Sequence, residues 1–201
     1  MEKSVFNTDY QEKNLTSKIV VGLERVSEAF KYLLWDHAKT IGISPIQIQI
    51  LIFIANHKRE LCSVSYLAKE FNITKPTVSD AVKVLVNKKL IIKDFSNTDS
   101  RSYTIVLSKS GKDLVLEIDK FANPIKSPLE SFNQSELEVL YTTINKLIYS
   151  LNKVGIIQVQ RTCYGCKFYE QNKGKHYCNF LNKQLNNNEI RLDCAEYEDA
   201  S

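Results

Sequence analysis

The chain has 201 residues, of which 43% are hydrophobic and 25% charged, and its formal net charge is +4. This composition is ordinary for a globular protein with one sizeable core and an appendage. No apolar run approaches the roughly 20 residues that a membrane span needs. The first residues also lack the apolar segment of a signal peptide. We therefore expect a cytoplasmic protein with no membrane contact.

Helical periodicity dominates the first third of the chain. Residues 1–10 are polar and are predicted to lack regular structure. Apolar residues at three- and four-residue steps then predict a long helix from about Leu15 to Gly42. Ser44, Pro45 and Gln47 form a capping-box pattern that predicts a second helix, mostly buried, running to about His57.

The pattern between residues 60 and 90 predicts a helix–turn–helix. A first helix is expected over Val64–Phe71, with a tight connection after it. Thr74 can cap the next helix, and Pro76 suits its first turn. One face of that helix is apolar, whereas the other carries short hydroxyls and charges that suit phosphates and base edges. The candidate DNA-binding residues here are Thr74, Lys75, Pro76, Thr77, Ser79, Asp80 and Lys83.

A β-hairpin is predicted after this helix. Residues 90–93 and 103–107 are rich in β-formers, and residues 96–102 between them are polar. A helix–turn–helix followed by such a hairpin is a winged helix. Within 74–112 there are eight Lys or Arg against three Asp, so the positive charge gathers on this unit. A merely solvated charged face is the alternative.

The hairpin tip and second strand read Asp-Ser-Arg-Ser-Tyr-Thr-Ile-Val-Leu-Ser-Lys-Ser-Gly over residues 99–111. This resembles the D-x-R…L-[ST]-x-x-G wing signature of the multiple-antibiotic-resistance regulator (MarR) family, and residues 74–90 are similar to its recognition helix. With the flanking helices, the resemblance covers roughly residues 10–153. It implies a dimeric DNA-binding regulator, with the recognition helix in the major groove and Arg101 in the adjacent minor groove. In such a regulator Asp99 would orient Arg101.

Two further helices are predicted before residue 155. Ser108 can cap the first, and the prolines at 124 and 128 break or kink the chain after it. Asn133 and Glu136 form a capping box that opens a strongly amphipathic helix reaching about Leu151. Its wide apolar stripe calls for a partner. We therefore predict dimerisation helices over 1–42 and 110–155, and a winged helix–turn–helix domain over 43–109.

Residues 156–201 are predicted to form a cysteine-rich metal-binding module. This segment is too short to bury much core, so its folding needs either disulfide bonds or a bound metal. Disulfides are disfavoured in a reducing compartment. The spacing C-x2-C-x11-C-x15-C therefore points to a metal centre, and the interleaved aromatic residues argue against a disordered tail. The predicted ligands are Cys163, Cys166, Cys178 and Cys194.

The identity of the metal stays open between two alternatives. Zinc sites often use two C-x2-C pairs, whereas this tail has one. Four cysteines with a single C-x2-C and wide spacing also hold [4Fe–4S] clusters. The tail is similar to the small four-cysteine modules of high-potential iron–sulfur proteins and related accessory subunits. We favour a [4Fe–4S] cluster over Zn2+, with His176 beside the ligands rather than among them.

The sequence thus predicts a mainly α (α+β) fold: a winged helix–turn–helix, flanking dimerisation helices and a small metal-binding tail. The expected function is sequence-specific transcription regulation as a homodimer on double-stranded DNA, responsive to redox state, oxygen or iron. The alternative is a winged-helix protein-interaction module with a structural zinc or electron-transfer tail. No catalytic set is recognisable, so an enzyme is not expected. Any small-molecule ligand is unknown, and Cys62 is interpreted as a buried, inert thiol.

Overall fold

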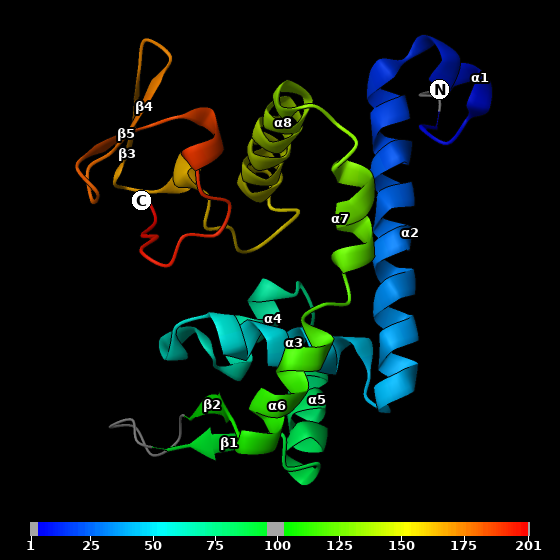
Figure 1. Cartoon of the computed structure of the whole chain (residues 1–201), viewed down its shortest axis with the longest axis vertical. Coiled ribbons are helices and arrows are strands. Elements are labelled where there is room, and N and C mark those ends of the chain that lie inside the picture. The colour runs from blue at the N-terminus through cyan, green and yellow to red at the C-terminus, as the bar shows by residue number, and fades with distance from the viewer. Residues whose placement is uncertain (1–3, 96–102, 201) are drawn as a thin grey trace.

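The structure is a computed structural model that describes residues 4–95 and 103–200. The fold is mainly helical, with two small antiparallel sheets (Figure 1). The elements of the first part are α1 (Thr8–Lys13), α2 (Leu15–Ile41), α3 (Pro45–Asn56), η1 (Arg59–Leu61), α4 (Val64–Glu70), α5 (Lys75–Asn87), β1 (Ile91–Asp94), β2 (Thr104–Leu107) and α6 (Lys109–Ile118). The rest comprises α7 (Asn123–Leu129), α8 (Gln134–Lys153), η2 (Cys163–Gly165), β3 (Tyr169–Asn172), β4 (Lys175–Cys178), β5 (Lys183–Leu185) and η3 (Asn187–Glu189).

The main hydrophobic core lies inside the winged-helix unit, between α3, α4, α5, β2 and α6. α3 is apolar all round and is accordingly buried in the middle of this unit. Its Ile48, Ile50 and Leu51 are fully buried, as are Leu67 of α4 and Leu85 of α5. The core therefore fixes α4 and α5 against α3, and this holds the second helix of the helix–turn–helix at the surface.

Capping residues set most helix ends where the sequence predicted them. α2 ends at Gly42, which adopts a left-handed φ of 71° that favours glycine. Ser44 and Gln47 form the predicted capping box of α3, and Asn133 and Glu136 form that of α8. These three expected boundaries are confirmed, because each depends on a local backbone conformation or hydrogen bond that the residue type already encodes.

Two segments differ from the prediction. Within residues 1–10 we expected no regular structure, but α1 begins at Thr8 and is capped by the Asn7 side chain. The two prolines were expected to break or kink a helix, yet both lie within α7: Pro124 stands in its first turn and Pro128 near its end. The chain instead turns before them, at residues 119–122, since a first-turn proline lacks only an N–H that needs no partner.

The last forty residues form a small sheet in the order β3–β4–β5, flanked by η2 and η3. In Figure 1 this sheet lies at the opposite side of α8 from α2. The Tyr141 hydroxyl of α8 donates to the Ile190 carbonyl at 2.5 Å, and the rings of Tyr149 and Tyr164 lie 6.3 Å apart. The tail is thus packed against α8 rather than extending from it.

Within the described residues, no single helix is long and apolar enough to cross a membrane. The bent pair α2 and α3 passes that test jointly, by length and composition only.

Candidate nucleic-acid interface and cysteine cluster

α5 presents its polar face outward because its apolar face is fixed in the core. Thr74 caps the helix by accepting from the backbone N–H of Thr77, and Pro76 occupies the first turn. Val78 and Leu85 are fully buried. The seven predicted DNA-binding residues of this region are all exposed, namely Thr74, Lys75, Pro76, Thr77, Ser79, Asp80 and Lys83. Within the described residues neither Lys75 nor Lys83 forms an ion pair, so both ammonium groups face solvent.

The wing is an antiparallel pair of strands beside α5. β1 and β2 pair from Ile91 with Leu107 to Asp94 with Thr104. Arg59 of η1 forms an ion pair with Asp94 and donates to the Thr104 hydroxyl at 3.1 Å, which ties the hairpin base to the core. Residues 96–102 lie outside the described residues, and so do the predicted minor-groove residue Arg101 and its neighbour Asp99. Their roles remain predictions.

The end of the wing signature has a packing explanation. Ser108 caps α6 by accepting from the Gly111 N–H at 3.0 Å, and its hydroxyl lies 2.7 Å from the Lys89 carbonyl. A Cβ at Gly111 would lie only 2.0 Å from the Leu90 carbonyl oxygen. The serine and the glycine therefore let α6 pack directly against the junction of α5 and β1, which positions the wing relative to the recognition helix.

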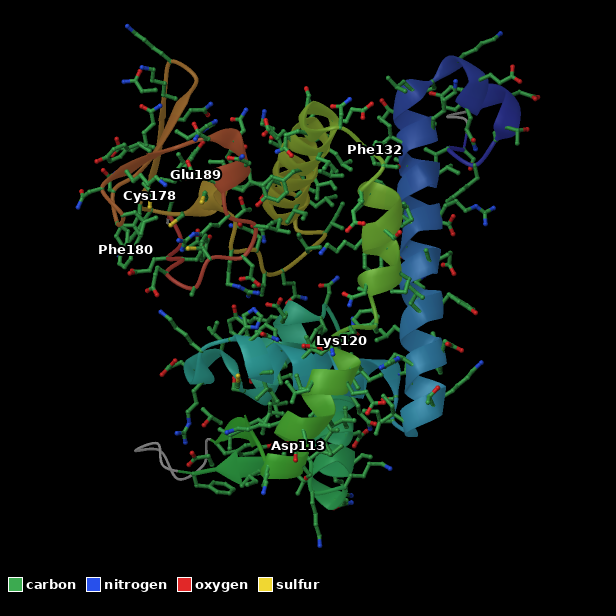
Figure 2. All side chains as sticks on the ribbon, viewed as in Figure 1. Asp113, Lys120, Phe132, Cys178, Phe180 and Glu189 are labelled. Atoms are coloured by element: carbon green, nitrogen blue, oxygen red, sulfur yellow. The ribbon has the colours of Figure 1, made fainter. Side chains whose placement is uncertain are left out.

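The four predicted metal ligands gather around one small cavity in the tail. Cys163 and Cys166 come from η2 and its end, Cys178 from the end of β4, and Cys194 from the loop after η3. The other walls are mainly apolar and include Phe168, Phe180, Leu181 and Leu185. Figure 2 shows Cys178, Phe180 and Glu189 close together in this part of the tail. All five cysteines of the chain are free thiols.

The electrostatics around these thiols are unusual for a surface module. Burial raises the pKa of Cys163; the backbone N–H of Arg191, 3.2 Å from its sulfur, opposes this shift, and the nearby thiols add to it. The Arg191 guanidinium lies 3.5 Å from the Cys194 sulfur, and this contact raises the pKa of Arg191. Among the described residues, however, no three His, Cys, Asp or Glu side chains are arranged to hold a single metal ion.

His176 has a structural role in the tail. It is buried in β4, with its Nδ1 atom 2.5 Å from the Tyr169 hydroxyl and its Nε2 atom 3.1 Å from the Asn187 side-chain oxygen. Both ring nitrogens are thereby engaged in fixing β3 and η3 to β4. The observed contacts of the histidine stabilise the small sheet, and its predicted place beside a metal centre stays a prediction.

A cluster of charged side chains around the buried Arg161 joins the tail to the helix–turn–helix, and no local sequence pattern predicts it. Arg161 is only 9% exposed and forms a double hydrogen bond to Glu70 of α4, at 2.7 and 3.1 Å. The same guanidinium donates to Asp193 at 2.6 and 3.0 Å. Burial opposes its charge and lowers its pKa, but the hydrogen bonds that Arg161 donates to Asp193 and Glu70 outweigh burial, so the net pKa of Arg161 is raised.

His57 and Phe53 form the floor of this cluster. The His57 ring stacks on Phe53 at 3.8 Å between centroids, and its Nε2 atom lies 2.9 Å from Asp193. Arg161 also lies over the Phe53 ring, at 5.6 Å. Sequence reasoning assigned no role to His57, because its partners lie 104 and 136 residues further along the chain. We refer to Arg161, Glu70, Asp193 and His57 as the anchor cluster.

An open crevice of about 1000 Å³ lies between the winged-helix unit and the tail. Most of the residues that line it are of polar types, including the anchor residues Arg161 and Asp193 and also Lys58, which is bridged to Glu196 at 3.0 Å. Its size would admit a small molecule, but its lining selects no ligand class.

Comparisons with known proteins agree on the first two thirds of the chain. A family model described as the MarR family matches residues 41–102. A search of curated proteins returns no match. The structure of S. aureus MepR in complex with DNA is 25% identical, with a TM-score of 0.58 over 66% of this chain and 97% of that one.

Two other solved structures give the same result. S. aureus MepR in its DNA-binding conformation is 25% identical, with a TM-score of 0.59 over 66% of this chain and 98% of that one. A MarR transcriptional regulator from Methanosarcina mazei Go1 is 21% identical, with a TM-score of 0.54 over 65% of this chain and 99% of that one, and shows the fold alone. Residues 41–102 therefore carry the MarR-type winged helix–turn–helix, on a chain that resembles transcriptional regulators of that family over about two thirds of its length.

Proposed function

We propose that this protein is a transcription regulator that binds double-stranded DNA in a sequence-specific manner as a homodimer. The observation that carries the proposal is the outward face of α5, which presents hydroxyls and the ammonium groups of Lys75 and Lys83 beside a winged hairpin; within the described residues neither ammonium group is in an ion pair. Such side chains bind phosphates and base edges. Support comes from MepR, a structurally similar protein whose structure was solved with DNA.

In the proposed geometry, α5 and the hairpin of the winged helix contact different grooves of the DNA. α5 enters the major groove, where Thr77 and Ser79 reach base edges and Lys75 and Lys83 neutralise phosphates. Arg101, at the predicted wing tip, enters the adjacent minor groove. Asp80 lies on the same exposed face of α5. Asp99, whose charge repels phosphate, serves to orient Arg101.

A second copy of the chain is the proposed partner of α2. Along this helix Leu15, Ile19, Leu23, Val26 and Phe30 recur at helical spacing, and each is between 41% and 72% exposed. A continuous apolar stripe of that length is unusual on a monomer and is typical of an interface. Two copies paired there would also present two recognition helices to two half-sites of DNA.

Titration of the chain's own promoter DNA at several salt concentrations tests DNA binding. We expect Lys83→Ala to weaken binding and to reduce the slope of log affinity against log salt by about 0.9, because one phosphate contact is lost. Arg101→Ala should reduce it by a similar amount. Lys120→Ala is the matched control, since Lys120 lies at the end of α6, away from the wing (Figure 2). Equal slopes in all four proteins would contradict the proposal.

Sedimentation equilibrium tests the dimer. Leu23→Glu should raise the dimer dissociation constant roughly 30-fold or more, because it places a charge in the apolar stripe. Arg25→Glu, at an exposed position outside that stripe, should leave dissociation unchanged. A wild-type protein that stays monomeric at micromolar concentration would refute the homodimer while leaving DNA binding open.

The signal, on this proposal, acts through the tail, as redox state, oxygen or iron. Its support is the arrangement of four free cysteines around one cavity in a segment that also contacts α4. A winged-helix protein-interaction module with a structural tail is the competing function, and absence of any promoter binding would favour it.

A further inference from the structure

We propose that Cys163, Cys166, Cys178 and Cys194 together hold one [4Fe–4S] cluster, and that the anchor cluster links this centre to the recognition unit. The cluster itself does not depend on the proposed function. The link does, since it concerns the control of DNA affinity.

The donor set is the first support for a metal centre. The four cysteines come from four places in the tail, yet they line one cavity of largely apolar walls. Four sulfurs around one apolar cavity form the donor set of a thiolate-bound metal centre. Arg191 adds a backbone N–H 3.2 Å from the Cys163 sulfur and a guanidinium 3.5 Å from the Cys194 sulfur.

The spacing of the cysteines favours a cluster over a single ion. Around one zinc the four sulfurs lie about 2.3 Å from the metal and crowd together. All four cysteines line one cavity, yet within the described residues no three such side chains are arranged to hold a single ion. In a cluster each thiolate binds its own iron, so the sulfurs stand further apart. The N–H···S contacts of Arg191 and the apolar walls are also the features that tune such clusters.

The link to the DNA-binding unit starts at Cys194. The residue before it, Asp193, is held by the Arg161 guanidinium, which also holds Glu70 of α4. The backbone continues this connection, since the Cys194 N–H donates to the Arg161 carbonyl at 3.1 Å. Arg161 in turn lies two residues before Cys163. Two of the four ligands are therefore tied to the single side chain that anchors the tail on α4.

This connection gives the centre a route to DNA affinity. With the centre bound, Asp193 and Arg161 are fixed and the tail is docked on α4, which packs against α5 in the core. Without it the loop bearing Cys194 loses its main constraint, and the docked arrangement is weakened. The two states differ in how α4 is held, so the centre and the DNA are coupled sites.

Metal analysis of the full chain, purified without oxygen, tests the cluster. We expect a brown protein with about four irons and four acid-labile sulfides per chain. Cys178→Ser and Cys194→Ser should lose most of that iron, whereas Cys62→Ser should keep it. Loss of iron in these variants could also come from misfolding, so Arg191→Gln serves as a second test. It should keep the fold and the iron but shift the visible spectrum or the reduction potential. One zinc per chain, or no metal, would overturn the proposal.

The link is tested by promoter affinity with and without the centre. In the wild type we expect the two affinities to differ by about fivefold or more. In Glu70→Gln, with the iron content unchanged, that ratio should fall towards one. An unaltered ratio would refute the link. A protein that binds iron but no DNA would refute the proposed function, and with it the link, but not the cluster. A protein that binds DNA but is purified without iron would refute the cluster and the link, but not the proposed function.

Discussion

The thiol of Cys62 differs from the four thiols of the tail in its surroundings. It is 1% exposed in the core, and burial, followed by the charge of Glu60, raises its pKa from 9.0 to about 11. Only on the order of one thiol in 10,000 is then ionised near neutral pH. We expect peptide-resolved alkylation of the native protein to leave Cys62 unmodified, with its rate rising as the pH approaches 11. Rapid modification near neutral pH would contradict this and identify a reactive thiol.

Gly111 is required by space and not by backbone conformation. Because a Cβ there would overlap the Leu90 carbonyl, Gly111→Ala must displace α6 from the junction of α5 and β1. We expect a loss of about 1–3 kcal/mol in the free energy of unfolding, measured by urea denaturation. Gly22→Ala is the control, since nothing lies within 4 Å of its added Cβ and alanine favours the helix. Equal stability of the two variants would show that α6 shifts at no cost.

Asn145 of α8 is fully buried, and both polar atoms of its side chain lack a hydrogen-bond partner within the described residues. A buried amide without partners costs about 1–3 kcal/mol. Asn145→Leu is nearly the same size and removes that cost, so thermal denaturation should show a more stable protein. A less stable variant would mean that the amide is paired in solution, by water or by a second copy of the chain.

At the scale of elements, Ser108 joins three pieces of the winged helix. It caps α6 and contacts the carbonyls of Lys89 and Leu90, at the end of α5 and the start of the wing. Ser108→Ala should therefore cost about 1–2 kcal/mol of folding free energy. Hydrogen exchange should increase at the start of α6 and in β1. An increase confined to α6 would show that Ser108 only caps α6 and does not stabilise the start of the wing.

The elements that could be predicted from sequence are those specified by local signals. Caps at Ser44, Thr74 and Asn133 fixed three helix starts, because each bond joins residues three positions apart. The strands β3–β5 carried no such signal. They are three or four residues long and mostly polar, and their order depends on pairing and on His176. α7 was missed because its prolines were interpreted as breaks, although they suit its ends.

At the scale of the whole molecule, one part of the candidate site could be predicted from local sequence patterns and another part could not. The apolar stripe of α5 predicted that its other face is exposed. The number of cysteines and the expected reducing compartment predicted that the four cysteines of the tail meet, and they line one cavity. The anchor cluster could not be predicted, since Arg161 and Glu70 lie 91 residues apart in the chain. No sequence pattern distinguishes this pair from the many other pairs of opposite charge. The tail is therefore part of the folded structure and contacts the unit that we propose binds DNA.

Hydrogen exchange of the full chain with and without its promoter DNA tests the central claim most directly, because it locates the contact surface without any substitution. The account predicts slower exchange in residues 74–87 and in the hairpin 91–107 when DNA is bound. The strands β3 and β4 of the tail should be unaffected. Protection confined to the tail or to α8, with α5 unchanged, would contradict the account.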